Sequence, residues 1–320
     1  MNIIDINNIH GFKIGSTENA EAATGVTVII SEAGATAGVD VRGGGPATRE
    51  TDLLKPENMV QQINAVVLSG GSAYGLEAAS GVMDELEKRN VGFETGFGLV
   101  PIVCGASLFD LCVGKSDVRP DKAMGSVAVE KAFQGSFEHG NHGAGTGATV
   151  GKYKGPGRMM KSGQGSSAIE VGKLQVGAIS AVNALGDIFD EEGTEIAGML
   201  SEDGMSFTPT AEIIMKDMSE QFDVFKGNTT ITCIITNAIL TKAQCTKLAS
   251  IAHDGYARAI KPVHSTADGD TIFVMASGEV EVNFDALAVA ATDQVQRAII
   301  DGTKKAESAY GLLAYSERKK

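Results

Sequence analysis

A Gly-Asn-Thr-Thr run at residues 227–230 carries residue types that could do chemistry. It ends a polar stretch and begins a β-branched pattern that predicts a strand. If the Asn228–Thr229 bond is cut, Thr229 gains a free α-amine, whose reference pKa is about 8, beside its own hydroxyl. That amine can act as the base that activates the hydroxyl. The run therefore fits a self-cleaving enzyme with an N-terminal threonine nucleophile, although taken alone it is a loop that meets a strand.

A glycine-rich segment, residues 70–75, follows a strand pattern and opens a helix pattern. Backbone N–H groups at such a helix start can bind an anion or an oxyanion. The alternative is a tight turn between strand and helix. The candidate substrate or oxyanion contacts in this segment are Gly70, Gly71, Ser72 and Tyr74.

A second glycine-rich segment, residues 143–153, resembles a phosphate-binding loop at first sight. Such a loop needs glycine where Thr146 stands, and Ser or Thr where Tyr153 stands. The glycines instead let the backbone approach a site closely. Lys152 at the end of the segment either presents a cation to developing negative charge or is an isolated surface lysine.

Three further polar residues flank predicted strands. The amide of Asn183, at a strand end, can donate to an oxyanion, although taken alone it is a turn residue. Asp268 and Asp270 precede a strand, so they form either a hairpin turn or a carboxylate pair that holds the Thr229 ammonium or hydroxyl. The five histidines show no catalytic spacing.

Composition narrows the class of protein. A net charge of −13 argues against nucleic acid or an anionic membrane as a partner. No run of 18 apolar residues predicts a membrane span. The four cysteines form no CxxC pair, which favours free thiols in a reducing cytoplasm, with Cys233 buried in a strand. No metal or other cofactor is expected.

The elements that position these residues alternate between β-branched runs and Ala-rich helical patterns. The polar stretch 193–228 reads mostly as loop, with a short helix around residues 212–218. Pro120 is placed in the first turn of a helix that runs toward Phe133. The other predicted strands cover residues 26–31, 65–69, 171–182, 229–236, 271–275 and 279–282, and the other predicted helices cover residues 74–88, 241–260 and 285–307.

Three segments in this order, residues 67–76, 145–152 and 227–230, resemble the L-aminopeptidase D-amidase/D-esterase (DmpA-like) family. The resemblance covers nearly the whole chain and is strongest to the nylon-oligomer (6-aminohexanoate) endo-hydrolase branch, which uses Thr as nucleophile and cuts after Asn. It implies a hydrolase of peptide or small-molecule amide bonds.

The resemblance also assigns roles by motif position. Thr229 matches the nucleophile, Lys152 and Asn183 match groups around its oxyanion, and Asp268 and Asp270 match carboxylates that orient it. The implied fold is α/β (α+β), a four-layer αββα sandwich like that of ornithine acetyltransferases and N-terminal nucleophile hydrolases. One domain, 1–320, would be cut into 1–228 and 229–320 and assemble as a homotetramer.

One departure concerns substrate choice. Aminopeptidase members carry an acidic motif that grips the free amino group of the substrate, whereas residues 100–110 here contain no acidic residue before Asp110. This departure favours an internal amide bond. Two other functions stay open from sequence: acyl transfer to an amine, as in ornithine acetyltransferases, and nucleotide binding by a non-catalytic protein around Gly145 to Lys152.

Overall fold

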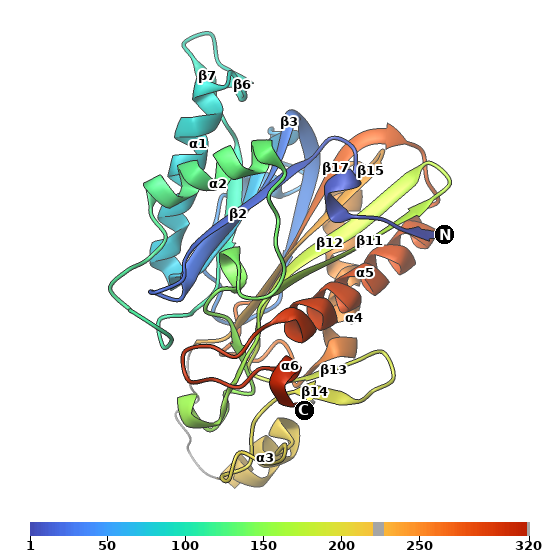
Figure 1. The fold of residues 1–320 in the computed structure, drawn as a ribbon. Coiled ribbons are helices and arrows are strands. Elements are labelled where there is room, and N and C mark those ends of the chain that lie inside the picture. Colours follow the sequence, from blue (N-terminus) through green and yellow to red (C-terminus); the bar gives the residue numbers. More distant parts are fainter. Residues whose placement is uncertain (220–226, 319–320) are drawn as a thin grey trace.

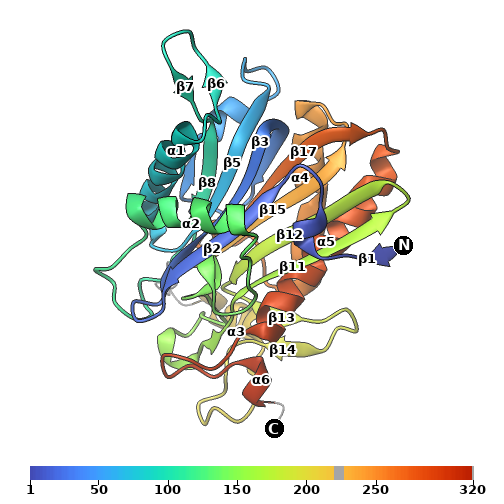
Figure 2. The same cartoon turned by 45° about the horizontal axis from the view of Figure 1, so that its top comes forward.

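The computed structural model describes residues 1–219 and 227–318. Its main feature is a ten-stranded sheet in the order β1-β11-β12-β15-β17-β3-β5-β8-β4, with β2 also paired to β3 (Figure 2). These strands are β1 (Asn2–Ile3), β2 (Lys13–Asn19), β3 (Thr24–Val41), β4 (Thr48–Arg49), β5 (Gln62–Ser69), β8 (Val103–Ser107), β11 (Gln164–Val171), β12 (Leu174–Asn183), β15 (Thr229–Ala238) and β17 (Thr271–Val280).

Strand β3 joins two halves of this sheet, because its 18 residues pair with different neighbours along their length. Ile29 lies opposite Val66 of β5, whereas Val39 lies opposite Phe273 of β17. A register shift separates the two ladders between Ile30 and Ala35. The halves face each other across a core that contains Ile29, Val66 and Phe273.

Helices cover the outer faces of both halves (Figure 1). Helices α1 (Ala78–Lys88) and α2 (Lys122–Gln134) pack on β2, β3 and β5, with Val28 in their core. Helices α4 (Lys242–Ala259) and α5 (Phe284–Lys305) pack on the β11-to-β17 half. The chain therefore has the expected four αββα layers, and its two sheets are continuous through β3.

The predicted helices are present in the structure, and two of them, the 74–88 helix and the helix after Pro120, begin differently from the prediction. Helix α4 begins at the predicted cap, because Thr241 and Gln244 form a reciprocal capping box. The 74–88 helix begins instead as a 3₁₀ turn over Ser72–Glu77. Pro120 lies just before the N-cap of α2, since the Asp121 side chain accepts the first-turn N–H of Met124.

The short helix expected around residues 212–218 is α3 (Thr210–Lys216). Residues 220–226 of the same polar stretch lie outside the described residues. Strand β17 is continuous over Thr271–Val280, so it merges most of two predicted strands. The strand predicted over residues 171–182 is β12, and β11, which forms a hairpin with it, was not predicted. The minor ladders are β6 (Phe93–Glu94) with β7 (Leu99–Val100), β9 (Thr149–Val150) with β10 (Met160–Lys161), and β13 (Asp187–Phe189) with β14 (Glu195–Ala197) and β16 (Ile260–Lys261). A four-residue helix, α6 (Tyr315–Arg318), follows α5.

The four cysteines are free thiols, and Cys233 is fully buried in β15 as expected. Across residues 1–219 and 227–318, no helix combines the length and apolarity that a bilayer crossing requires.

Candidate active site

Thr229 begins strand β15 at the point where the polar stretch ends. It pairs with Asn183 of β12 and is only 4 % exposed. Its hydroxyl donates to the carbonyl oxygen of the preceding residue, Asn228. The backbone N–H of Gly269 donates to the same oxygen at 2.9 Å. A hydroxyl and an amide donor therefore converge on the carbonyl of the predicted scissile bond.

Lys152 lies in the protein interior rather than on the surface. Its Nζ donates to the Asn183 carbonyl at 2.9 Å, to Asn183 Oδ1 at 2.8 Å and to the Gly227 carbonyl at 2.8 Å. Burial lowers the pKa of Lys152 to about 8, although neighbouring acidic groups oppose the shift. These contacts also count against nucleotide binding, because the ammonium already has three protein acceptors.

Asn183 connects Lys152 to Thr229. Its Oδ1 accepts the Thr149 backbone N–H at 3.0 Å as well as the Lys152 ammonium, which fixes the orientation of the amide. Its Nδ2 donates to the Phe109 carbonyl at 2.9 Å and lies 3.4 Å from the Gly227 carbonyl. The Asn183 amide nitrogen thus lies near the carbonyl of Gly227, two residues before Thr229.

The two carboxylates lie beside the junction and have different partners. Asp268 accepts the Ser265 N–H at 2.8 Å, and burial, together with the charge of Asp270, raises the pKa of Asp268 to about 6. Asp270 Oδ1 accepts the Thr230 N–H at 2.8 Å, and Oδ2 lies 2.8 Å from His264 Nδ1. The Asp270 carboxylate is therefore fixed on the peptide that follows Thr229.

The Gly-Gly-Ser turn uses its backbone donors inside the protein. The N–H groups of Gly70, Gly71 and Ser72 donate to the Gly25 carbonyl, Asp110 Oδ1 and the Leu108 carbonyl, respectively. Tyr74 is 59 % exposed, with the Arg119 guanidinium over its ring. The structure thus brings Ser72 to the site but leaves Tyr74 at the surface.

A cavity of about 330 Å³ opens at the junction. Among the described residues its lining carries no charged side chain. The lining residues are Gly45, Ala47, Ser72, Ser107, Phe109, Gly227, Asn228, Thr229, Thr266 and Ala267. A neutral acyl group of modest size fits such a lining better than an ammonium group does.

Sequence reasoning missed Asp110, Gly269 and His264 as parts of this site. Asp110 is buried, and it accepts the Thr24 hydroxyl and the Gly71 N–H, both at 2.7 Å. Gly269 is the glycine between the two predicted aspartates. His264 lies six residues before Asp270, a spacing that matches no known catalytic pattern. Only the tertiary contacts identify these three residues.

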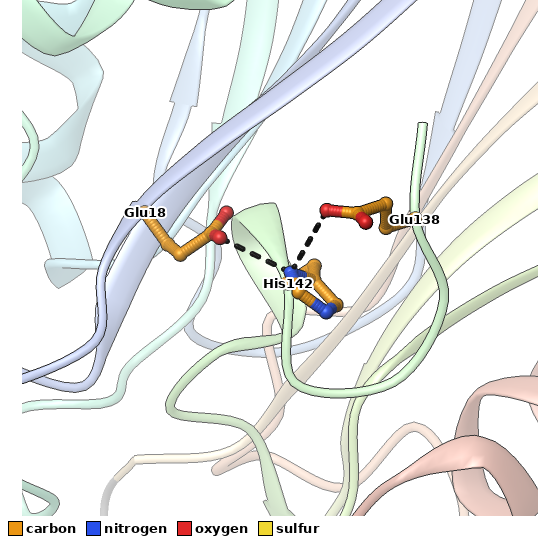
Figure 3. Close-up of side chains that lie close together, drawn as sticks. All are labelled: Glu18, Glu138 and His142. Carbon is orange, nitrogen blue, oxygen red and sulfur yellow. Dashed lines mark hydrogen bonds and ion pairs between the residues drawn. The ribbon is translucent and has the colours of Figure 1, made fainter. Parts of the chain in front are cut away.

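Glu18, Glu138 and His142 are the one group within the described parts of the chain whose ligand atoms lie close enough to hold a metal ion. His142 Nδ1 lies 3.1 Å from Glu18 Oε1 and 3.3 Å from Glu138 Oε2 (Figure 3). The Gly143 N–H donates to the other oxygen of Glu18 at 3.1 Å. Both carboxylates contact the same ring nitrogen, Nδ1, and none of the three residues lines the cavity at Thr229.

Comparison with known proteins places these observations in a family context. The model of peptidase family S58 matches residues 2–314. An uncharacterized aminopeptidase of Mycobacterium leprae is 37 % identical over 338 residues, covering 98 % of this chain and 91 % of the relative. A 6-aminohexanoate-oligomer endohydrolase of Paenarthrobacter ureafaciens is 32 % identical over 310 residues, covering 92 % and 84 %.

Solved structures share the fold at lower identity. The L-aminopeptidase D-Ala-esterase/amidase of Ochrobactrum anthropi, described as a variant of the N-terminal nucleophile hydrolase fold, matches with a TM-score of 0.74 and 19 % identity over 98 % of this chain and 92 % of that one. A Burkholderia β-aminopeptidase matches with a TM-score of 0.66 and 21 % identity over 93 % and 85 %.

Proposed function

The chain belongs to peptidase family S58 and is a hydrolase of amide or peptide bonds, and from this premise we propose that it cuts itself between Asn228 and Thr229 and then uses Thr229 as its nucleophile. One observation carries the proposal. The Thr229 hydroxyl contacts the Asn228 carbonyl, and the Gly269 N–H donates to the same oxygen at 2.9 Å.

Self-cleavage begins when the Thr229 hydroxyl oxygen attacks the Asn228 carbonyl carbon. The Gly269 N–H stabilises the oxyanion that forms, in the manner of an oxyanion hole. The hydroxyl proton passes to the Thr229 nitrogen as the C–N bond breaks, which leaves an ester between Asn228 and Thr229 Oγ. Water then hydrolyses the ester and releases a carboxylate on Asn228 and a free amine on Thr229.

The mature site then acts on a substrate amide. The α-amine of Thr229 takes the hydroxyl proton as Oγ attacks the substrate carbonyl, and the leaving amine departs with that proton. Water resolves the acyl-enzyme. Lys152 and Asn183 both contact Gly227 in the uncut chain. When cleavage frees that segment, their N–H groups become donors for the substrate oxyanion, and Asp268 and Asp270 hold the new ammonium group.

The substrate class follows from the cavity. Its described lining contains no carboxylate for a substrate ammonium, and Asp110 already accepts two protein hydrogen bonds. An aminopeptidase needs such an anchor, whereas an enzyme that cuts inside an oligoamide does not. The 6-aminohexanoate-oligomer endohydrolase relative supports the same reading. The proposed substrates are therefore peptide-like or oligoamide chains that are cut at an internal amide bond. We further propose that the enzyme is a cytoplasmic homotetramer: the free thiols favour the cytoplasm, and the family resemblance favours the tetramer.

The test compares the wild type with Thr229→Ala and Thr229→Ser, using denaturing gels and N-terminal sequencing. Wild type and Thr229→Ser should yield a fragment that begins at residue 229, because both carry a hydroxyl. Thr229→Ala should stay full-length and should not hydrolyse a 6-aminohexanoate oligomer. A wild-type protein that hydrolyses the oligomer while remaining one uncut chain would refute the proposal. Transfer of the acyl group to an added amine in preference to water would make the enzyme an acyltransferase.

A further inference from the structure

His264 lies close to the site without touching Thr229 or lining the cavity. Its backbone N–H donates to Asp270 Oδ2 at 3.2 Å, and its Nδ1 lies 2.8 Å from the same oxygen. Because that oxygen accepts the backbone donor, it acts as an acceptor for the ring as well, so Nδ1 carries the hydrogen. The His264 side chain is 18 % exposed, and the Asp270 side chain is 2 % exposed.

The imidazole is itself held in place by helix α4. Its ring centroid lies 4.7 Å from that of His253, edge to face, and 5.8 Å from that of Tyr256, stacked. Within the described residues, its Nε2 is buried and has no hydrogen-bond partner. Among the described residues, the hydrogen bond to Asp270 is therefore the only one that the His264 ring makes.

Asp270 passes this constraint to the nucleophile. Its other oxygen, Oδ1, accepts the Thr230 N–H at 2.8 Å. The Tyr256 hydroxyl donates to the Thr230 carbonyl at 3.1 Å, so the residue after Thr229 is held on both sides. The peptide between Thr229 and Thr230 sets the direction of the Thr229 side chain. A rotation of the Asp270 carboxylate would displace the hydroxyl from the Asn228 carbonyl.

We propose that His264 is a positioning residue, whose Nδ1–H fixes the carboxylate of Asp270 and through it the Thr229 hydroxyl, both in self-cleavage and in substrate turnover. This inference rests on the proposed function of Thr229. A displacement of about 1 Å in a reacting group can cost on the order of 10²-fold in rate. Because the proposed role of His264 is to set the position of the Thr229 hydroxyl, loss of the ring should lower kcat and the processing rate rather than change KM.

The backbone conformation at His264 permits substitutions that change the side-chain donor without straining the chain. Its φ of +57° lies in the left-handed region, which glycine adopts freely and asparagine tolerates better than most residues. His264→Gly removes the ring donor without straining this backbone. His264→Asn keeps an N–H donor at nearly the position of Nδ1, and His264→Gln places a donor one bond farther out.

The experiment follows self-cleavage by pulse-labelled cell-free synthesis and a chase on denaturing gels, and then measures turnover of a 6-aminohexanoate oligomer. His264→Gly should slow processing and lower kcat about 10- to 100-fold, with KM within about twofold of wild type. His264→Asn should recover most of both rates, and His264→Gln should not. His10→Asn, at a side chain that is 75 % exposed, is the matched control and should behave as wild type.

Two results would overturn the inference: wild-type processing and kcat in His264→Gly, or rates in His264→Asn as low as those in the glycine variant. Thermal midpoints identify variants that fail to fold, in which case the comparison of the Asn and Gln variants decides alone. Failure of the proposed function is a separate result, because the wild type itself would then lack a terminus at residue 229.

Discussion

Gly269 contributes to the junction through both its amide and its missing side chain. Its N–H is the donor on the Asn228 carbonyl, while a Cβ at this position would stand 2.7 Å from Thr229 Oγ1. Real Cβ atoms do not approach an oxygen so closely, so the hydroxyl must move away from the carbonyl. Asn228, Thr229 and Gly269 thus form one packed unit at the junction.

Gly269→Ala should therefore slow self-cleavage by on the order of 10²-fold, because the hydroxyl is displaced while the amide donor remains. The rate is followed by denaturing gel on freshly synthesised chain. Gly157→Ala is the control, since a Cβ there meets no atom within 4 Å. Unchanged cleavage in Gly269→Ala would show that the hydroxyl does not attack from its observed position.

The buried carboxyl of Asp110 should make the free energy of unfolding depend on pH. Burial raises its pKa from 3.8 to about 6, against the hydrogen bonds from Thr24 and Gly71. Between these two values the folded chain binds more protons than the unfolded chain, so stability falls as pH rises. The cost of the buried charge is complete above about pH 6 and absent below about pH 4. A shift of roughly two units corresponds to about 3 kcal/mol.

Asp110→Asn removes this ionisation but can still accept the Gly71 N–H. Relative to this variant, the starting protein should lose about 3 kcal/mol of unfolding free energy between pH 4 and pH 7. Urea unfolding on the uncut Thr229→Ala background measures the difference for a single chain. Asp117→Asn, at an exposed position, should give a constant difference. If the stability difference between Asp110→Asn and its parent does not change with pH, the prediction is wrong.

Residue types left the roles of Lys152, Asn183, Asp268 and Asp270 open, and the family resemblance grouped them with Thr229. Thr229, Lys152, Asn183, Asp268 and Asp270 do meet around one junction. Their positions at strand ends and next to glycines were compatible with a shared site, and the family resemblance supplied their roles. Asp110 and Gly269 were missed because their partners, Thr24 and Asn228, are far away in sequence, and His264 was missed because its spacing from Asp270 matched no pattern that was considered.

At the scale of elements, local patterns predicted the helices and strands better than their pairing. The period-3.6 patterns marked α4 and α5, because each helix buries one face in a large core, whereas β15 is buried on both faces and was marked by its run of β-branched residues. The 18-residue length of β3 was not predictable from its apolar run 26–31. Its second part is rich in Gly and Ala, and its conformation depends on α4: a Cβ on Gly38 would stand 2.3 Å from the Thr246 nitrogen.

Helix α4 also explains why the site is well fixed. The same helix that packs against Gly38 carries Tyr256, whose hydroxyl oxygen lies 3.1 Å from the Thr230 carbonyl oxygen of β15 and 3.2 Å from the Thr271 carbonyl oxygen of β17. The helix therefore ties together the two parallel strands that begin at Thr229 and just after Asp270. Such pairing between distant segments is set by packing and cannot be read from either segment alone.

At the scale of the whole molecule, the proposed cleavage site would divide the sheet without dividing its core. Strands β15 and β17, both after the predicted cut, lie side by side between β12 and β3, which precede it. Backbone hydrogen bonds therefore cross from one fragment to the other on both sides of the β15–β17 pair. Helices α4 and α5, also after the cut, cover strands from both fragments, including β3 and β11.

This topology predicts that fragments 1–228 and 229–320 stay together after cleavage. Separation would expose β12 and β3 as open sheet edges and uncover the apolar core under α4 and α5. We expect native size-exclusion chromatography with light scattering to give one species with the mass of four chains. Denaturing mass spectrometry should give two fragments in equal amounts from that peak. Fragments that elute separately without denaturant would contradict the shared core, and any other assembly mass would reject the tetramer while leaving the shared core in place.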